Sequence, residues 1–201
     1  MAESPPTRTL ILATAARLFA AEGYAAVSMR DVAAETSMTP ANLYHHFKDK
    51  ETLIRESLVH VFSDRNAAFE TLFAKAKNPD EKIETFVDWF VHLLFEDEVF
   101  SKLMYREILD GDAKRLEYLA KTILERPFSM VTSAIAECVD DEDPVMLMVS
   151  IEGLVTGHFQ MAGVITHLPG GRAKHADPRV VSRHIMEIVR KVLGLPSKRR
   201  R

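Results

Sequence analysis

The sequence predicts an all-α protein of about nine helices. Apolar residues recur at the three- and four-residue spacing of amphipathic helices through most of the 201 residues. Three further helix starts are marked by a capping residue before a proline, at Asn78-Pro79, Asp143-Pro144 and Asp177-Pro178. The alternation of apolar and polar residues that marks an exposed strand is nowhere sustained, so we expect no sheet.

The first expected helix ends at Gly23. Its apolar face carries Ile11, Ala15, Leu18 and Phe19 at helical spacing. Glycine is a usual residue just after a helix, because it adopts the left-handed conformation at little steric cost.

Two short helices should follow the first. Ser28, with Asp31 three residues later, is a variant of the capping box, so a helix should start at Met29. Thr39 can then accept the free N–H groups of a new helix, and Pro40 at its first position has no N–H to leave unpaired.

The connection between these two helices is a tight turn. Ser37 and Met38 alone separate them, and Met38 with Leu43 is spaced as a hydrophobic staple. This arrangement is typical of a helix-turn-helix, whose second helix enters the major groove of DNA.

The remaining helices follow from the same local chemistry. Asp49 should cap a long fourth helix. Besides the helices that begin at the three capped prolines, we expect helices near 98–110 and over 114–139, and Pro127 should kink or split the latter. The polar, glycine-rich segment 168–177 should be a loop.

Over residues 8–55 the chain resembles the TetR family of one-component bacterial transcriptional regulators. The matching positions are Leu18-Phe19, Gly23-Tyr24, Ser28–Ala33, Leu43–Phe47, Lys50-Glu51 and Leu53. Ser37 departs from the family, which often has glycine there; a left-handed residue at this turn would cost about 1 kcal/mol. Beyond this segment the resemblance covers architecture alone.

The resemblance implies a division of the chain into parts with different functions. Residues 1–52 should form the helix-turn-helix DNA-binding domain, and residues 53–195 a helical domain for effector binding and dimerisation. Residues 196–201 are a basic tail, which we expect to be disordered and solvated, or to add nonspecific DNA affinity.

Nine residues are expected at the DNA interface, at or near the helix starts of the motif. They are Ser28, Arg30, Thr39, Pro40, Ala41, Asn42, Tyr44, His45 and Lys50. The first residues of the second helix contact base edges, and the amide of Asn42 can pair with adenine through two hydrogen bonds. Alternatively, Asn42 simply faces solvent near the start of the helix. The resemblance implies phosphate contacts for the last three of the nine.

Charge and cysteine content restrict the possible partners and location. Residues 1–55 carry six Lys or Arg and six Asp or Glu, so DNA binding must depend on the placement of single cations and on helix N-termini. The lone Cys138 excludes an internal disulfide, which fits the cytoplasm. No apolar run approaches the roughly 20 residues of a membrane span, and no secretory signal is apparent. We therefore expect no membrane partner.

Two stripes on the last long helices are candidates for a dimer interface. They are Ser150, Gly153 and Gly157 on one helix, and Val181, Ile185, Ile188 and Val192 on the other. Spacing alone leaves open that both stripes face the protein's own core. The family pairs these helices with those of a second subunit, so the resemblance implies a homodimer. Two-fold symmetry also suits the reading of two operator half-sites about 34 Å apart.

The resemblance further implies a cavity for a small-molecule effector. Its candidate residues are aromatic, methionine and polar side chains of the central helices, namely Trp89, His92, Phe100, Met104, Tyr105, Arg106, Tyr118, Phe128 and His158. The alternative for the aromatic and methionine side chains is plain core packing. The polar groups, Glu107 among them, need a partner in apolar surroundings, and an internal pair such as Arg106 with a neighbouring carboxylate could replace the ligand. The aromatic side chains suggest an apolar or planar effector, and no cofactor or metal is expected.

The sequence therefore predicts a DNA-binding transcriptional regulator, most commonly a ligand-responsive repressor of a palindromic operator. A dimeric adaptor without DNA binding is one alternative, against which the intact caps, Tyr44 and Lys50 argue. An enzyme is the other. The chain lacks the H-E-x-x-H, G-x-S-x-G and glycine-rich phosphate-loop motifs, and His45 and His46 point about 100° apart on a helix.

Overall fold

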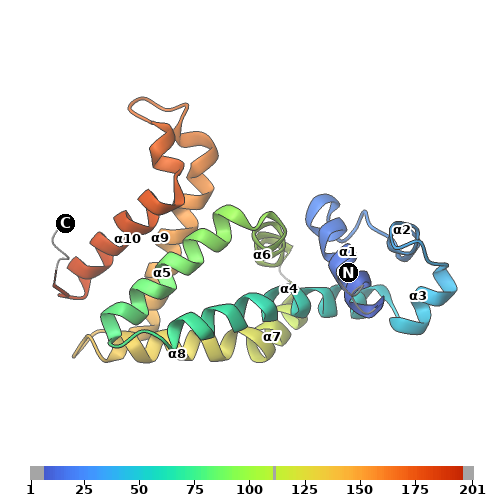
Figure 1. The fold of residues 1–201 in the computed structure, drawn as a ribbon, viewed down its shortest axis with the longest axis horizontal. Helices are drawn as coiled ribbons and strands as arrows, with labels where there is room; N and C mark the ends of the chain where they lie inside the picture. Colours follow the sequence, from blue (N-terminus) through green and yellow to red (C-terminus); the bar gives the residue numbers. More distant parts are fainter. Residues whose placement is uncertain (1–6, 111, 197–201) are drawn as a thin grey trace, which may run out of the picture. The chain divides into compact units, whose positions relative to one another are not determined.

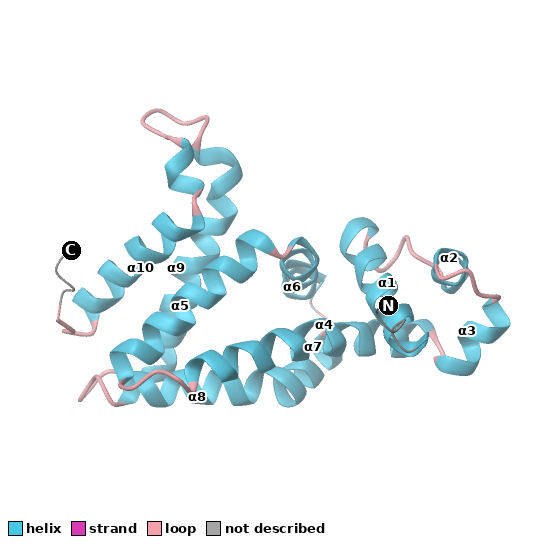
Figure 2. Cartoon of the chain, in the orientation of Figure 1, coloured by secondary structure: helices cyan, strands magenta, loops and turns pink. Residues whose placement is uncertain are grey.

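The structure, a computed structural model, describes residues 7–110 and 112–196, and every regular element in these ranges is helical (Figures 1 and 2). In chain order the elements are α1 (Thr7–Glu22), α2 (Met29–Glu35), α3 (Pro40–His46), α4 (Lys50–Phe73), α5 (Pro79–Glu96), α6 (Glu98–Asp110), α7 (Ala113–Leu119), η1 (Ala120–Leu124), α8 (Glu125–Ala136), α9 (Pro144–Ile165), η2 (Ala173–Ala176) and α10 (Pro178–Val192). η1 is a turn of π-helix and η2 a turn of 3₁₀-helix. The all-α expectation is confirmed. The expected tail falls, from residue 197, outside the described residues.

The helix starts expected from local chemistry are confirmed. Asn78, Asp143 and Asp177 each accept a hydrogen bond from a backbone N–H of the first turn, and α5, α9 and α10 begin at the proline that follows. At α3 the hydroxyl of Thr39 accepts from the N–H of Asn42 at 3.2 Å. Each cap satisfies a donor that has no partner within its own helix.

The helix expected over 114–139 is interrupted. It consists of α7, η1 and α8, so the described residues hold ten α-helices. Pro127 has no N–H to donate to the carbonyl of Ile123, four residues earlier. The side-chain amide of Asn66 donates to that carbonyl instead, at 2.9 Å. The interruption expected from the proline therefore lies one turn before it, at 120–124.

The chain divides into two compact units. Unit 1 contains the chain up to Asn66 together with Glu98–Leu124, and unit 2 contains Ala67–Asp97 and the chain from Glu125 onward. α4 is a continuous helix whose first part belongs to unit 1 and whose last turns belong to unit 2. The functional division expected after residue 52 is not tested by these units and stays a prediction.

The core of unit 1 is formed by large apolar side chains of its first four helices. The fully buried ones include Ile11, Phe19, Leu43, Phe47 and Leu53. Arg8 lies over this core: its guanidinium is 4.4 Å from the centroid of the Phe47 ring, and its Nη1 donates to the carbonyl of His46 at 2.9 Å. His46 and Phe47 therefore hold the end of α3 against α1.

The turn between α2 and α3 is left-handed at a residue that is not glycine. Ser37 has a φ of 56°, in the region that favours glycine. The N–H of Met38 donates to the carbonyl of Ala33 at 2.8 Å, which closes the turn after α2. The left-handed turn considered for Ser37 is therefore present.

Replacing Ser37 with glycine is expected to stabilise unit 1 by up to about 1 kcal/mol, because glycine removes the steric cost of the left-handed conformation. The gain stays below the full steric cost, since glycine also increases the entropy of the unfolded chain. Urea unfolding followed by circular dichroism would measure the change. Ser63→Gly, at an exposed position inside α4, is the control and should destabilise. A Ser37→Gly variant less stable than the parent would contradict the prediction.

Unit 2 is built from α5, α8, α9 and α10, which pack against one another. Polar contacts join α10 to α5: the guanidinium of Arg190 contacts Asp80 at 3.0 Å and Glu84 at 3.1 Å, and the hydroxyl of Ser182 donates to Asp88 at 2.8 Å. These contacts fix which face of α10 is turned toward α5.

α9 is long and apolar enough, by length and composition alone, to cross a membrane. The expectation that no apolar run is long enough is therefore wrong for this helix, whose 22 residues include one charged side chain, Glu152. Burial raises the pKa of the Glu152 carboxyl. Bundle helices pass the same test of composition, and α9 packs against α5, α8 and α10, so we assign it to the bundle of unit 2.

Candidate nucleic-acid interface

α3 presents most of its surface to solvent. Leu43 is fully buried and anchors the helix, and Phe47 just after it is 1% exposed. The residues expected to touch DNA are exposed: Thr39, Pro40, Ala41, Asn42, Tyr44 and His45. Tyr44 is a large aromatic side chain with 53% of its surface accessible. A helix held by so few buried side chains leaves its first turn free for contact with another molecule.

The start of α2 is closed by a complete capping box. The N–H of Ser28 donates to the Asp31 carboxylate at 2.7 Å, and the N–H of Asp31 donates to the Ser28 hydroxyl at 3.3 Å. The Ser28 side chain and then its backbone N–H hold the pKa of Asp31 below its usual value, and the Lys50 charge acts in the same direction. Ser28 and Arg30 are exposed here, beside the carboxylate of Asp31.

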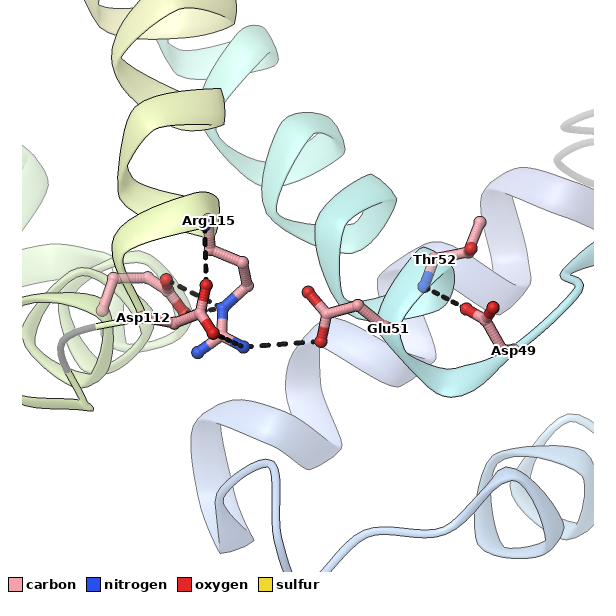
Figure 3. Close-up of polar contacts among 6 residues, drawn as sticks. Asp49, Glu51, Thr52, Asp112 and Arg115 are labelled. Atoms are coloured by element: carbon pink, nitrogen blue, oxygen red, sulfur yellow. Dashed lines mark hydrogen bonds and ion pairs between the residues drawn. The ribbon is translucent and has the colours of Figure 1, made fainter.

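The start of α4 brings Lys50 close to α2. Asp49 caps the helix by accepting from the N–H of Thr52 at 2.7 Å (Figure 3), a bond that lowers the pKa of Asp49. Lys50 is half-buried, and its charge reaches Asp31 on α2. The structure thus brings the expected contacts of α2 and α4 together in unit 1, while α2 also packs against α3.

A buried ion pair that the sequence did not suggest lies in the same unit. Arg115, 8% exposed, donates through Nε to Glu107, which is 3% exposed, at 3.1 Å. Its Nη1 lies 3.5 Å from a carboxylate oxygen of Glu51 at the start of α4 (Figure 3), and its guanidinium is 5.0 Å from the centroid of the Tyr24 ring. One side chain of α7 therefore contacts α6, α4 and the connection between α1 and α2.

Arg115 is a permanent cation. Burial opposes its charge, but the bond to Glu107 and the charges of Glu107, Glu51 and Asp112 outweigh burial and raise the pKa of Arg115. Glu107 was expected to need a partner in apolar surroundings, and the guanidinium of Arg115 is that partner. Residues 107 and 115 lie on two different helices, so helical spacing cannot predict that they meet. The sequence therefore offered no signal for this pairing.

The residues proposed for an effector cavity are distributed over both units. Unit 1 holds Phe100, Met104, Tyr105, Arg106 and Tyr118, and unit 2 holds Trp89, His92, Phe128 and His158. In unit 1 Phe100 and Met104 are buried, and Phe100 packs on Phe62 with ring centroids 4.7 Å apart. These two side chains therefore belong to a packed core.

Arg106 has backbone partners. Its Nη2 donates to the carbonyls of Ala20 and Ala21 at 3.3 and 3.4 Å, so it caps the end of α1 from α6. Gly23 follows that end with a φ of 91°, and a Cβ added to it would lie 2.9 Å from Nη1 of Arg106. Arg106 therefore has internal partners, but they are backbone carbonyls and not the neighbouring carboxylate that the alternative proposed.

Two grooves in unit 2 each contain one of the proposed residues. Trp89 lines a groove of about 1530 Å³ between α5 and α10. The centroid of its ring lies 4.7 Å from the centroid of the Phe69 ring. His158 lines another of about 740 Å³ beside α9, together with His184, whose ring is 5.5 Å away. Trp89 and His158 therefore do not share a cavity.

The stripes proposed for dimerisation are only partly accessible. Val181 and Ile185 are buried within unit 2, so these two residues face the subunit's own core, as the alternative held. The others keep some accessible surface: Ser150, Gly153 and Val192 are exposed, and Gly157 and Ile188 are half-buried.

α9 exposes an apolar stripe that extends the two glycines. Met146, Val149, Met161 and Val164 are all exposed and lie on the same face of the helix as Gly153 and Gly157, at spacings of three and four residues. The sequence signal for this stripe was the nearly continuous apolar composition of the helix. Such a contiguous apolar face typically marks an interaction surface.

The structure gives no indication of a metal centre in the described ranges 7–110 and 112–196. No group of three or more His, Cys, Asp or Glu side chains there could hold a metal ion.

Comparison with known proteins finds a family match within the N-terminal part. Residues 11–57 match the family model described as bacterial regulatory proteins, tetR family. The chain is 36% identical over 89 residues to the HTH-type transcriptional regulator UidR of Escherichia coli (strain K12), which is 44% of this chain and 41% of UidR. It is 33% identical over 76 residues to the HTH-type transcriptional repressor KstR2 of Mycolicibacterium smegmatis, which is 38% of this chain and 37% of KstR2.

These matches span about two fifths of the curated relatives. A solved structure is similar over more of the chain: AibR, crystallised with isovaleryl coenzyme A and operator DNA, aligns with a TM-score of 0.72 over 91% of this chain and 97% of AibR. At 20% identity this likeness shows a shared fold. The resemblance to the TetR family over the helix-turn-helix is confirmed.

Proposed function

We propose that this protein is a sequence-specific DNA-binding transcriptional regulator, a ligand-responsive repressor that binds a palindromic operator as a homodimer. The observation that carries the proposal is the exposed first turn of α3, held by buried Leu43 within a TetR-family helix-turn-helix. The names of UidR and KstR2, and the operator DNA bound to AibR, support it. The matched relatives are regulators, and we propose no enzymatic activity.

In the proposed complex α3 lies in the major groove. Asn42 reads adenine, with Thr39, Pro40 and Ala41 beside the neighbouring base edges. Ser28, Arg30, Tyr44, His45 and Lys50 hold phosphates on either side and fix the register. Because the six Lys or Arg of residues 1–55 are balanced by six Asp or Glu, the phosphate contacts of these single cations should contribute more to DNA affinity than the net charge of the domain does.

The proposed homodimer associates through the apolar stripe of α9 and the exposed part of α10. The two glycines allow a partner helix to approach closely, and the exposed methionine and valine side chains supply apolar area. Two-fold symmetry then presents two copies of α3 to two half-sites about 34 Å apart.

The proposed effector is a small apolar or planar molecule bound among the central helices. AibR, which shares the fold, was solved with an acyl coenzyme A. The aromatic and polar residues proposed from the sequence remain the candidates, with Trp89 at a groove of unit 2. The effector must bind the DNA-free conformation more tightly than the DNA-bound one, since only differential affinity shifts the equilibrium. We place the protein in the cytoplasm, where its operator would be.

Selection of bound fragments from random DNA would test the proposal. We expect enrichment of an inverted repeat, and an affinity that falls steeply with salt because phosphate contacts release counterions. Anisotropy titrations of the selected fragment at several salt concentrations would measure that slope. Failure to enrich any sequence would remove the regulator proposal.

Two single substitutions should separate base reading from phosphate contact. Asn42→Ala is expected to relax preference at one base pair of each half-site, with a loss of about 1–3 kcal/mol of discrimination. Lys50→Ala should weaken binding to all sequences alike and reduce the salt slope by about one. Repeated selection with each variant gives both readouts, and Lys77→Ala, an exposed lysine after α4, is the charge control. An unchanged motif with Asn42→Ala would assign base reading to another residue.

A further inference from the structure

Arg115 joins three stretches of unit 1 that are distant in the sequence. Its guanidinium binds buried Glu107 on α6, lies against the Tyr24 ring before α2, and reaches Glu51 in the first turn of α4. Asp112, the N-cap of α7, accepts from the backbone N–H of Arg115 at 2.8 Å and fixes where its side chain begins. This guanidinium is therefore held from several sides.

Glu51 is the most exposed of the three carboxylates around Arg115. Its side chain is 52% exposed, and Figure 3 shows it directed from α4 toward Arg115. Lys50, the residue before it, carries a charge that reaches Asp31 at the start of α2. If Glu51 lost its partner, its carboxylate would be free to approach Lys50 and any phosphate bound there, and like charges repel.

We infer that Arg115 is a positioning residue of the DNA interface, which holds the Glu51 carboxylate toward α7 and away from the phosphate site of Lys50. The inference rests on the proposed function. The contact also makes operator affinity respond to α6 and α7, because both members of the buried pair belong to those helices. A movement that withdraws Arg115 from Glu51 weakens DNA binding by releasing a negative charge beside Lys50.

The test requires a variant that frees Glu51 without unfolding unit 1. Removing Arg115 alone would leave Glu107 buried and unpaired, which is strongly destabilising. The double variant Glu107→Leu/Arg115→Met replaces a buried pair by apolar side chains of similar volume, a change that is often neutral. It removes one positive and one negative charge, so the net charge of the protein is unchanged. Thermal unfolding by circular dichroism checks that the fold persists.

We expect the double variant to bind the selected operator about two- to fivefold more weakly at low salt, with the difference shrinking as salt rises. Adding Glu51→Gln to the double variant should restore the parent's affinity, because the released side chain is then neutral. The control adds Glu117→Gln instead. Glu117 pairs with Lys121 at 2.6 Å on the exposed side of α7, and its neutralisation should restore nothing.

A double variant that binds like the parent would overturn the inference. So would weaker binding that Glu51→Gln fails to restore, because Arg115 would then act through general packing. A parent that selects no DNA sequence would remove the proposed function as well. One readout needs no DNA: the Nε–H signal of Arg115 in a nitrogen-15 spectrum should shift with Glu51→Gln and stay in place with Glu117→Gln. An unmoved signal with Glu51→Gln would show that the contact itself is absent.

Discussion

Replacing Gly157 with leucine is expected to dissociate the proposed homodimer while the subunit stays folded. A Cβ at Gly157 would meet nothing within 4 Å, so the added side chain enters open space in the subunit. Leucine also favours the helix more than glycine does. The same side chain would separate two helices that approach each other along the stripe of α9, and loss of the second half-site contact should weaken operator binding by about 10²-fold or more.

Sedimentation velocity, with circular dichroism on the same samples, would separate dissociation from unfolding. Gly163→Leu is the matched control: it lies on α9 with equal free space around its Cβ, but about a quarter-turn away from the stripe. We expect this control to remain a dimer. A folded and fully dimeric Gly157→Leu variant would mean that the tight part of the contact lies elsewhere.

Glu107→Ala is expected to have the largest effect on stability, a loss of about 3 kcal/mol or more in the free energy of unfolding. The substitution leaves the Arg115 charge buried without its principal partner, and such losses are typically about 3–5 kcal/mol. The carboxylates of Glu51 and Asp112, at 3.5 and 4.0 Å, keep the cost toward the lower end.

Denaturant unfolding would measure this loss. Glu117→Ala, which breaks an exposed pair with Lys121, should change stability by less than about 1 kcal/mol. If both variants lost equal stability, burial of the Glu107–Arg115 pair would not be the cause of the loss in the Glu107→Ala variant.

The helix starts could be predicted from the sequence because caps are local. A capping side chain and its backbone donor lie two or three residues apart, as at Asn78 and Thr39. The interruption before Pro127 was predictable in kind, but its position also depends on Asn66, which is 57 residues distant from the carbonyl that it binds. Local chemistry gives the start of a helix, whereas long-range partners decide where a helix is interrupted.

Which residues of α3 face solvent was also predictable, because helical periodicity places them on the side opposite buried Leu43. The partners of the buried Arg115 and the half-buried Arg106 were not predictable. Arg115 and Arg106 contact groups 64 to 86 residues away, and no period in the sequence relates them. For Val181 and Ile185 the spacing was correct but ambiguous, since a stripe that faces a partner and one that faces the core have the same period.

The contact of Arg106 with the end of α1 limits how the helix-turn-helix of this protein could be joined to the bodies of other proteins. A chimera made by joining its first 66 residues to a foreign effector-binding body would keep the helix-turn-helix but lose the arginine that binds the carbonyls of Ala20 and Ala21. The foreign body would have to supply an equivalent cation from its own helix, beside a residue as small as Gly23. Exchange of DNA-reading segments, in the laboratory or by gene fusion, should therefore succeed mainly between proteins that share this cap.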